Sequence, residues 1–115
     1  MQEITTDEVL QKVAAGKPYT LLVLINGLPL PNDEAAVKQM QLQHLTHLFV
    51  LEQKGETSVF GPISNDKTFG GLIIFNTTDK ERIKNLMKDD PFIKGGHFKY
   101  ELYDFFSIPG QQLAG

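Results

Sequence analysis

The segment YTLLVLI, residues 19–25, is a continuous apolar run with aromatic and β-branched members. Lys17 and Pro18 precede it, and Asn26 and Gly27 follow it. A short apolar run between turn-forming residues is typical of a strand that is buried on both faces. We therefore predict that residues 19–25 form a strand of a sheet.

Helices are predicted on both sides of this strand. Residues 6–16 combine a capping hydroxyl, early acidic residues, apolar residues at helical spacing and a closing glycine, which indicates a short leading helix. After a proline-rich turn, Asn32 can cap a long helix over residues 33–54. At 100° per residue its apolar residues form one stripe that includes a histidine: Val37, Met40, His44, Leu48 and Leu51. His47 falls at the polar edge of that stripe.

The second half of the chain predicts a hairpin, a helix and a last strand. Residues 57–63 and 70–75 read as paired strands joined by turn-forming residues. A capping box over residues 78–81 begins a second helix, which must stop before Pro91. The aromatic-rich residues 97–106 read as the final strand.

After the leading helix, the predicted order is β-α-β-β-α-β. This order is typical of a ferredoxin-like α+β fold, with a four-stranded antiparallel sheet and both helices on one face. We predict one domain over residues 1–115, with a core of residues 19–106, an additional N-terminal helix within residues 1–16 and a tail at 107–115. In this architecture, the simplest way to cover the open face of the sheet is with the same face of a second copy, so we expect a homodimer.

Composition limits the function. The 115 residues carry a formal net charge of −3, which gives no general attraction for nucleic acid. The chain has no cysteine, so thiol chemistry and cysteine-ligated metals are excluded. No run approaches the ~18 apolar residues of a membrane span, and the acidic N-terminal residues do not suit a signal peptide. We expect a cytoplasmic protein that does not bind membranes.

A series of short motifs resembles the YciI-like (YCII-related) family. They are HLTHL at residues 44–48, FGPI at 60–63, GLII at 71–74 and DPFIKGG at 90–96, with Leu51 and Gly55 between the first two. The resemblance extends over about residues 19–106. The leading helix is additional to the usual start of the family, and residues 103–105 (YDF) stand where many members end in Pro-Trp.

The resemblance implies a dimeric α+β barrel with a His/Asp centre in a pocket of each subunit. The matching residues are His44 and Asp90, and we predict that the pocket also includes Phe60, Gly61, Pro62 and Phe92. A histidine within an apolar stripe needs a partner, and a carboxylate would suit it for acid–base chemistry. The alternative is a core histidine bonded to a backbone carbonyl, with Asp90 as an ordinary turn residue before proline.

Two other readings of these residues stay open. His44 and His47 could ligate a metal with His97 or Asp66, but two helical ligands lack a clear third, so we predict no metal and no cofactor. Glycines at residues 61, 70 and 71 could let a ligand approach the backbone, or could simply form a bulge and a bend. The phosphate loop, dinucleotide fingerprint and nucleophile elbow are absent from the sequence.

The sequence thus supports three functions. The first is a small enzyme that uses His44 and Asp90 for isomerase, lyase or hydrolase chemistry on a small organic substrate. The second is a module that binds a small ligand without reacting it. The third is a purely structural dimer.

Overall fold

The computed structural model describes residues 3–115; Met1 and Gln2, part of the predicted N-terminal extension, lie outside the described residues. Its elements, in chain order, are α1 (Thr6–Ala14), β1 (Lys17–Asn26), α2 (Glu34–Gln53), β2 (Thr57–Pro62), β3 (Phe69–Phe75), α3 (Lys80–Met87), α4 (Pro91–Lys94) and β4 (Phe98–Ser107). The four strands form one antiparallel sheet in the order β2-β3-β1-β4. The predicted ferredoxin-like α+β fold is confirmed, with α1 as an addition at the start.

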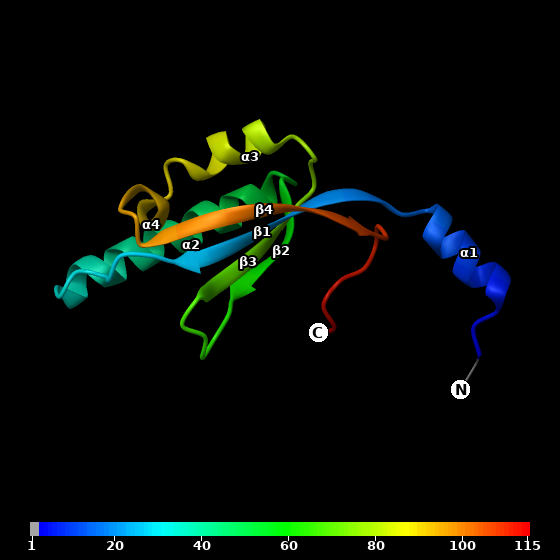
Figure 1. Cartoon of the computed structure of the whole chain (residues 1–115), viewed down its shortest axis with the longest axis horizontal. Helices are drawn as coiled ribbons and strands as arrows, with labels where there is room; N and C mark the ends of the chain where they lie inside the picture. Colours follow the sequence, from blue (N-terminus) through cyan, green and yellow to red (C-terminus); the bar gives the residue numbers. More distant parts are fainter. Residues whose placement is uncertain (1–2) are drawn as a thin grey trace.

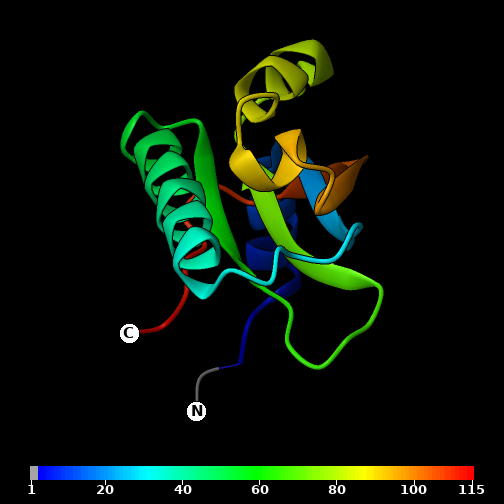
Figure 2. The same cartoon turned by 90° about the vertical axis from the view of Figure 1, so that its left-hand side faces the viewer.

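The central strand β1 sorts its side chains between the two faces of the sheet. Thr20, Leu22 and Leu24 are buried, whereas the alternate residues are only partly covered. Because successive strand residues point to opposite faces, one face carries the core and the other is open in the single chain. Helices α2, α3 and α4 all lie on the covered side (Figures 1 and 2).

The core forms where α2 and α3 pack on that covered face. Its buried residues come from β1, α2, β3 and α3: Leu22, Leu24, Leu48, Leu51, Ile73, Phe75, Ile83 and Met87. Each such side chain contributes about 1.5–3 kcal/mol by leaving water. This packing fixes the angle at which α2 crosses the sheet and therefore where its histidines lie.

Helix α2 begins one residue later than the sequence suggested. Asp33, rather than Asn32, is the N-cap, because its carboxylate accepts hydrogen bonds from the backbone N–H groups of Ala35 and Ala36. The helix ends before Gly55, whose φ of 77° favours glycine. Within α2 the buried residues are His44, Leu48 and Leu51, so the predicted stripe is buried only over its second half.

The chain after β3 differs from the prediction in two places. Asp79 rather than Thr78 caps α3, accepting a hydrogen bond from the backbone of Arg82. Helix α3 ends at Met87, before Pro91 as predicted, but residues Pro91–Lys94 form the additional short helix α4. Proline is favourable at the first position of a helix because its missing N–H is not needed there.

Helix α1 extends away from the end of the sheet (Figure 1). Thr5 caps it in a reciprocal capping box with Glu8, one residue before the predicted hydroxyl cap. None of its residues is buried. At the other end of the chain, β4 continues through Ser107, so the tail without regular structure begins one residue later than predicted.

Across residues 3–115 the helices are all too short or too polar to cross a membrane.

Candidate functional site

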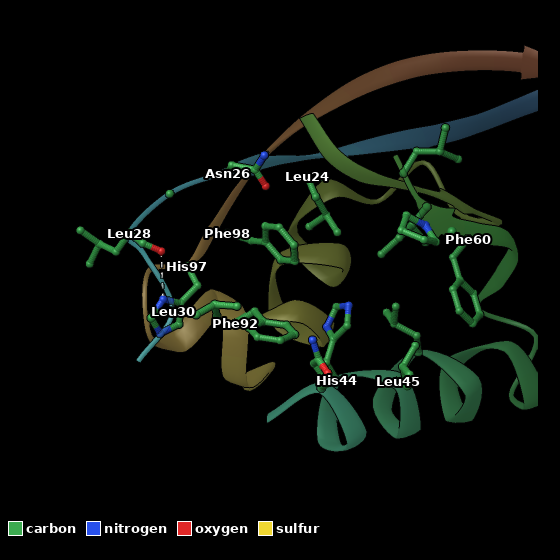
Figure 3. A pocket seen from close by; sticks show the side chains of 18 of the residues that line it. Leu24, Asn26, Leu28, Leu30, His44, Leu45, Phe60, Phe92, His97 and Phe98 are labelled. Atoms are coloured by element: carbon green, nitrogen blue, oxygen red, sulfur yellow. Dashed lines mark hydrogen bonds between the residues drawn. The ribbon is translucent and has the colours of Figure 1, made fainter. Parts of the chain in front are cut away.

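A cavity of about 510 Å³ lies between α2 and the sheet, near the point where β1 ends and β4 begins (Figure 3). Helix α2 supplies one wall, and the β2–β3 hairpin, α4 and the loop after β1 supply the others. Its lining includes Leu24, Leu28, Leu30, Leu45, Leu48, Phe60, Phe92 and Phe98, so the walls are mostly apolar. A volume of this size matches a small-molecule site.

His44 extends into this cavity from α2 (Figure 3). The residue is only 9% exposed, and its ring packs edge-on against Phe92 with 4.9 Å between ring centroids. Phe98 lies on a second side of the ring at 6.1 Å. The side chain is therefore held in one orientation by aromatic packing.

Asp90 lies behind His44 and is completely buried. It is the N-cap of α4, where its Oδ1 accepts a hydrogen bond of 3.0 Å from the backbone N–H of Phe92. Its Oδ2 is 2.6 Å from Nδ1 of His44 and 3.1 Å from Nδ1 of His47. One carboxylate thus caps a helix and binds two imidazoles.

These contacts decide the charge on Asp90. Burial alone would favour the protonated acid, but the hydrogen bonds from His44 and His47 outweigh it and hold the pKa of Asp90 well below its usual range. The hydrogen bond to Asp90 raises the pKa of His47 above its ordinary value, against the opposing effect of partial burial. Asp90 is therefore a carboxylate at neutral pH.

The ionised carboxylate also fixes the tautomer of His44. A carboxylate only accepts hydrogen bonds, so Nδ1 of His44 carries a proton and donates it to Oδ2 of Asp90. In the neutral ring Nε2 is then the basic nitrogen, and within residues 3–115 no protein group hydrogen-bonds to it. The site accordingly presents a proton acceptor to a mostly apolar cavity, which is the arrangement that general base catalysis requires.

The structure brings the predicted site residues together. Phe60, Gly61, Pro62 and Phe92 line the same cavity as His44. Asp90 does not line it but supports His44 from behind. The backbone-carbonyl alternative for His44 is wrong, because its Nδ1 partner is the Asp90 carboxylate.

His47 is the member of the site that the sequence did not assign. Its position at the edge of the helix stripe, three residues after His44, was the available signal. The signal was insufficient because the position of Asp90 depends on α4, which was not predicted.

The other residues of the alternative metal site, His97 and Asp66, make hydrogen bonds elsewhere. Nδ1 of His97 is 3.1 Å from the carbonyl oxygen of Leu28, and Asp66 accepts hydrogen bonds from the backbone of Thr68 and Phe69. In the part of the chain from residue 3 onward, no group of three or more His, Asp or Glu side chains is placed to hold a metal.

The paired glycines allow close packing of the chain itself. A Cβ at Gly70 would lie 2.4 Å from the ring of Phe98, and one at Gly71 would lie 2.8 Å from the carbonyl oxygen of Gly61. The β1–β3 register shifts at this place, between Leu24 and Ile25. The bulge interpretation explains both glycines without a ligand.

Two solved structures are similar to this chain, and the first of them shows the same general fold. Muconolactone isomerase superposes with a TM-score of 0.62 at 13% identity, over 84% of this chain and 97% of that protein. The 5-chloro-2-hydroxyhydroquinone dehydrochlorinase TftG from Burkholderia phenoliruptrix AC1100, in complex with 2,5-dihydroxybenzoquinone, gives 0.49 at 20% identity, over 72% and 90%. No functionally curated protein has a sequence that matches this chain.

The family relationship rests on the sequence. The model of the YCII-related domain matches residues 21–106, which contain every residue of the His44, His47 and Asp90 cluster. The resemblance inferred from the short motifs is confirmed, and the chain belongs to the YCII-related domain family.

Proposed function

We propose that this protein is an enzyme that moves a proton on a small organic molecule, with His44 as the general base and acid. The observation that carries the proposal is the 2.6 Å contact between Nδ1 of His44 and Oδ2 of Asp90, which leaves Nε2 directed to the cavity. Asp90 orients the ring and stabilises its protonated form during the reaction.

The reaction class follows from a histidine base held by a carboxylate, in a cavity that no serine, threonine or tyrosine of residues 3–115 lines. Nε2 of His44 takes a proton from a carbon next to a carbonyl group, and the C–H electron pair passes into an enolate. Returning the same proton to another carbon gives isomerisation, whereas departure of a leaving group gives elimination. Hydrolysis fits as well, if Nε2 takes its proton from an attacking water. The likeness to muconolactone isomerase supports small-molecule chemistry at the level of fold only.

The walls of the cavity favour an uncharged substrate with about one ring. No Lys, Arg, Asp or Glu from residues 3–115 lines the cavity. A carboxylate in such a site would lose its hydration without gaining a cation, and an ammonium would lose it without gaining an anion. Phe60, Phe92 and Phe98 instead offer faces and edges to a flat ring.

Matched ligands test this preference. At pH 8 we expect benzamide to shift the NMR signals of His44 and Phe92 at concentrations at which benzoate shifts them at least about tenfold less, because only benzoate buries an unpaired charge. Leu45→Trp, which enlarges a side chain in the cavity wall, should weaken the binding of benzamide. Tighter binding of benzoate would contradict the preference for uncharged molecules.

We also propose that two copies of the chain associate through the open face of the sheet. The side chains of Leu21, Val23 and Ile25 point to that face and are only partly covered in the single chain. A partly apolar sheet face of this kind is stable when a second sheet covers it, and an isologous pair covers both copies at once.

Light scattering at micromolar concentration tests the association. The expected mass is about 26 kDa, twice the 12.9 kDa of one chain. Val23→Lys should give the monomer because it buries a charge at the centre of the interface, whereas Lys38→Glu on the exposed side of α2 should leave the mass unchanged. A monomeric wild-type protein would overturn the proposed dimer.

The enzymatic proposal itself is tested by screening cyclic ketones, lactones and enols for conversion. Consumption of a compound by the wild-type protein and not by His44→Gln supports it. Saturable binding without conversion of any bound compound would instead indicate a ligand-binding module.

A further inference from the structure

His47 shares the buried carboxylate with His44, although it lies outside the cavity. Its Nδ1 is 3.1 Å from the same Oδ2 atom of Asp90 that His44 contacts, and its side chain is 24% exposed. His47 therefore connects α2 to the cap of α4.

His47 contacts the same buried carboxylate as His44. Asp90 is completely unexposed, and a buried carboxylate is costly unless a positive group pairs with it. Of its two imidazole partners, the His47 side chain is the more exposed, at 24% against 11%, so it carries a positive charge at the smaller cost of desolvation. His47 and Asp90 thus form an ion pair behind the cavity, in addition to the hydrogen bond between Asp90 and His44.

Few charged or titratable groups lie near His47. Asp90 faces it directly, Asp89 acts on it by its charge at longer range, and His44 reaches it only through the shared oxygen. All of these groups favour the positive form of His47 or are neutral in the resting tautomer. The pair of Asp90 and His47 has no net charge.

The geometry points to His47 as a positioning residue: a resident positive charge that neutralises Asp90, so that Asp90 can orient His44 without keeping a proton on its Nε2. This inference rests on the proposed function, because it concerns the availability of the same base. An isolated carboxylate 2.6 Å from His44 would strongly favour the imidazolium form of that ring, in which Nε2 cannot accept a proton. Because His47 is charged, the electric field that the Asp90 carboxylate exerts at His44 is reduced. The hydrogen bond between Asp90 and His44 is retained.

The variant His47→Asn separates the charge from the hydrogen bond. The asparagine amide nitrogen takes the place of Nδ1, so it can still donate to Asp90, but it carries no charge. His97→Asn is the matched control, since it removes another histidine near the cavity that does not contact Asp90. Both variants are compared with the wild type by nitrogen-15 NMR of the imidazole groups across pH.

Three results are expected. In the wild type at pH 7, both ring nitrogens of His47 are protonated. In His47→Asn, the pH at which half of His44 is protonated moves up by about one unit, because a neighbouring positive charge is gone. In His97→Asn the same midpoint stays within about 0.2 units of the wild type.

Other results would overturn the inference. If His47 is neutral in the wild type at pH 7, the inference is wrong. This measurement needs no variant, so it decides the question even if His47→Asn does not fold. A folded His47→Asn protein with lower stability and an unchanged His44 midpoint would mean that His47 serves only packing. Because these measurements need no substrate, they can succeed even if no turnover is ever found, which would end the proposed function alone.

Discussion

Replacing His44 with glutamine is expected to lower kcat/KM for the substrate by about 10²–10⁴-fold, the usual contribution of a positioned acid–base group. Glutamine is similar in size and its amide can still donate to Asp90, so the ring pocket beside Phe92 should stay filled. It lacks a basic nitrogen at the position of Nε2. The measurement is steady-state turnover of a compound found in the screen.

The control for this substitution lies on the same helix. Gln43 is exposed and points away from the cavity, so Gln43→Ala should keep the wild-type kcat/KM. Melting curves of both variants show whether the fold is retained. Wild-type turnover in a folded His44→Gln protein would remove His44 from the mechanism.

Replacing Asp90 with alanine is expected to cost about 3–5 kcal/mol of the free energy of unfolding, because it leaves a buried charge without its partner. The change removes the cap of α4 and leaves His47 facing no carboxylate. Asp89→Ala is the matched control: the neighbouring carboxylate is exposed, and its removal should change stability by less than about 0.5 kcal/mol. Urea unfolding at pH 7 measures both.

The pH dependence of the free energy of unfolding distinguishes the effect of the charge on Asp90 from its effect as the cap of α4. The folded protein lowers the pKa of Asp90 below the ordinary 3.8, so its stabilising effect is present above that pH and is lost as the pH falls through the folded pKa. Asp90→Asn keeps the cap but cannot ionise, so acidification below about pH 4 should destabilise it less than the wild type. Equal acid sensitivity of the two proteins would show that Asp90 is not the carboxylate that titrates.

The raised pKa of His47 acts in the opposite direction. Its stabilising effect is complete below the ordinary value of 6.5 and is lost as the pH rises through the folded pKa. The wild type should therefore be most stable in mildly acidic solution.

The fold was predictable because its signals are local. The apolar run at residues 19–25, the stripe on the long helix and the turn-forming residues between the strands at 57–63 and 70–75 each indicate one part of the fold. Their order leaves few topologies. The short helix α4 was missed because a proline after two aspartates reads as a stop. Only the buried contacts of Asp90 show that the same proline starts a new turn.

The site was predictable only in part. Helical periodicity placed His44 on the buried side of α2, but Asp90 lies 46 residues further along the chain, and the family resemblance alone connected the two. His47 was assigned to a helix border because its contact depends on how α3 and α4 pack against α2. Such long-range packing produces no periodic pattern in the sequence.

The double role of Asp90 has a consequence for how this protein can diversify. The residue that supports the base also begins the helix that carries Phe92 into the cavity wall, so a substitution there alters reactivity and pocket shape together. Leu28 and Leu30 line the cavity from the exposed loop after β1, and neither belongs to the cluster of His44, His47 and Asp90. Divergence in ligand preference among related chains should therefore accumulate in that loop, while the proton-handling side stays constant.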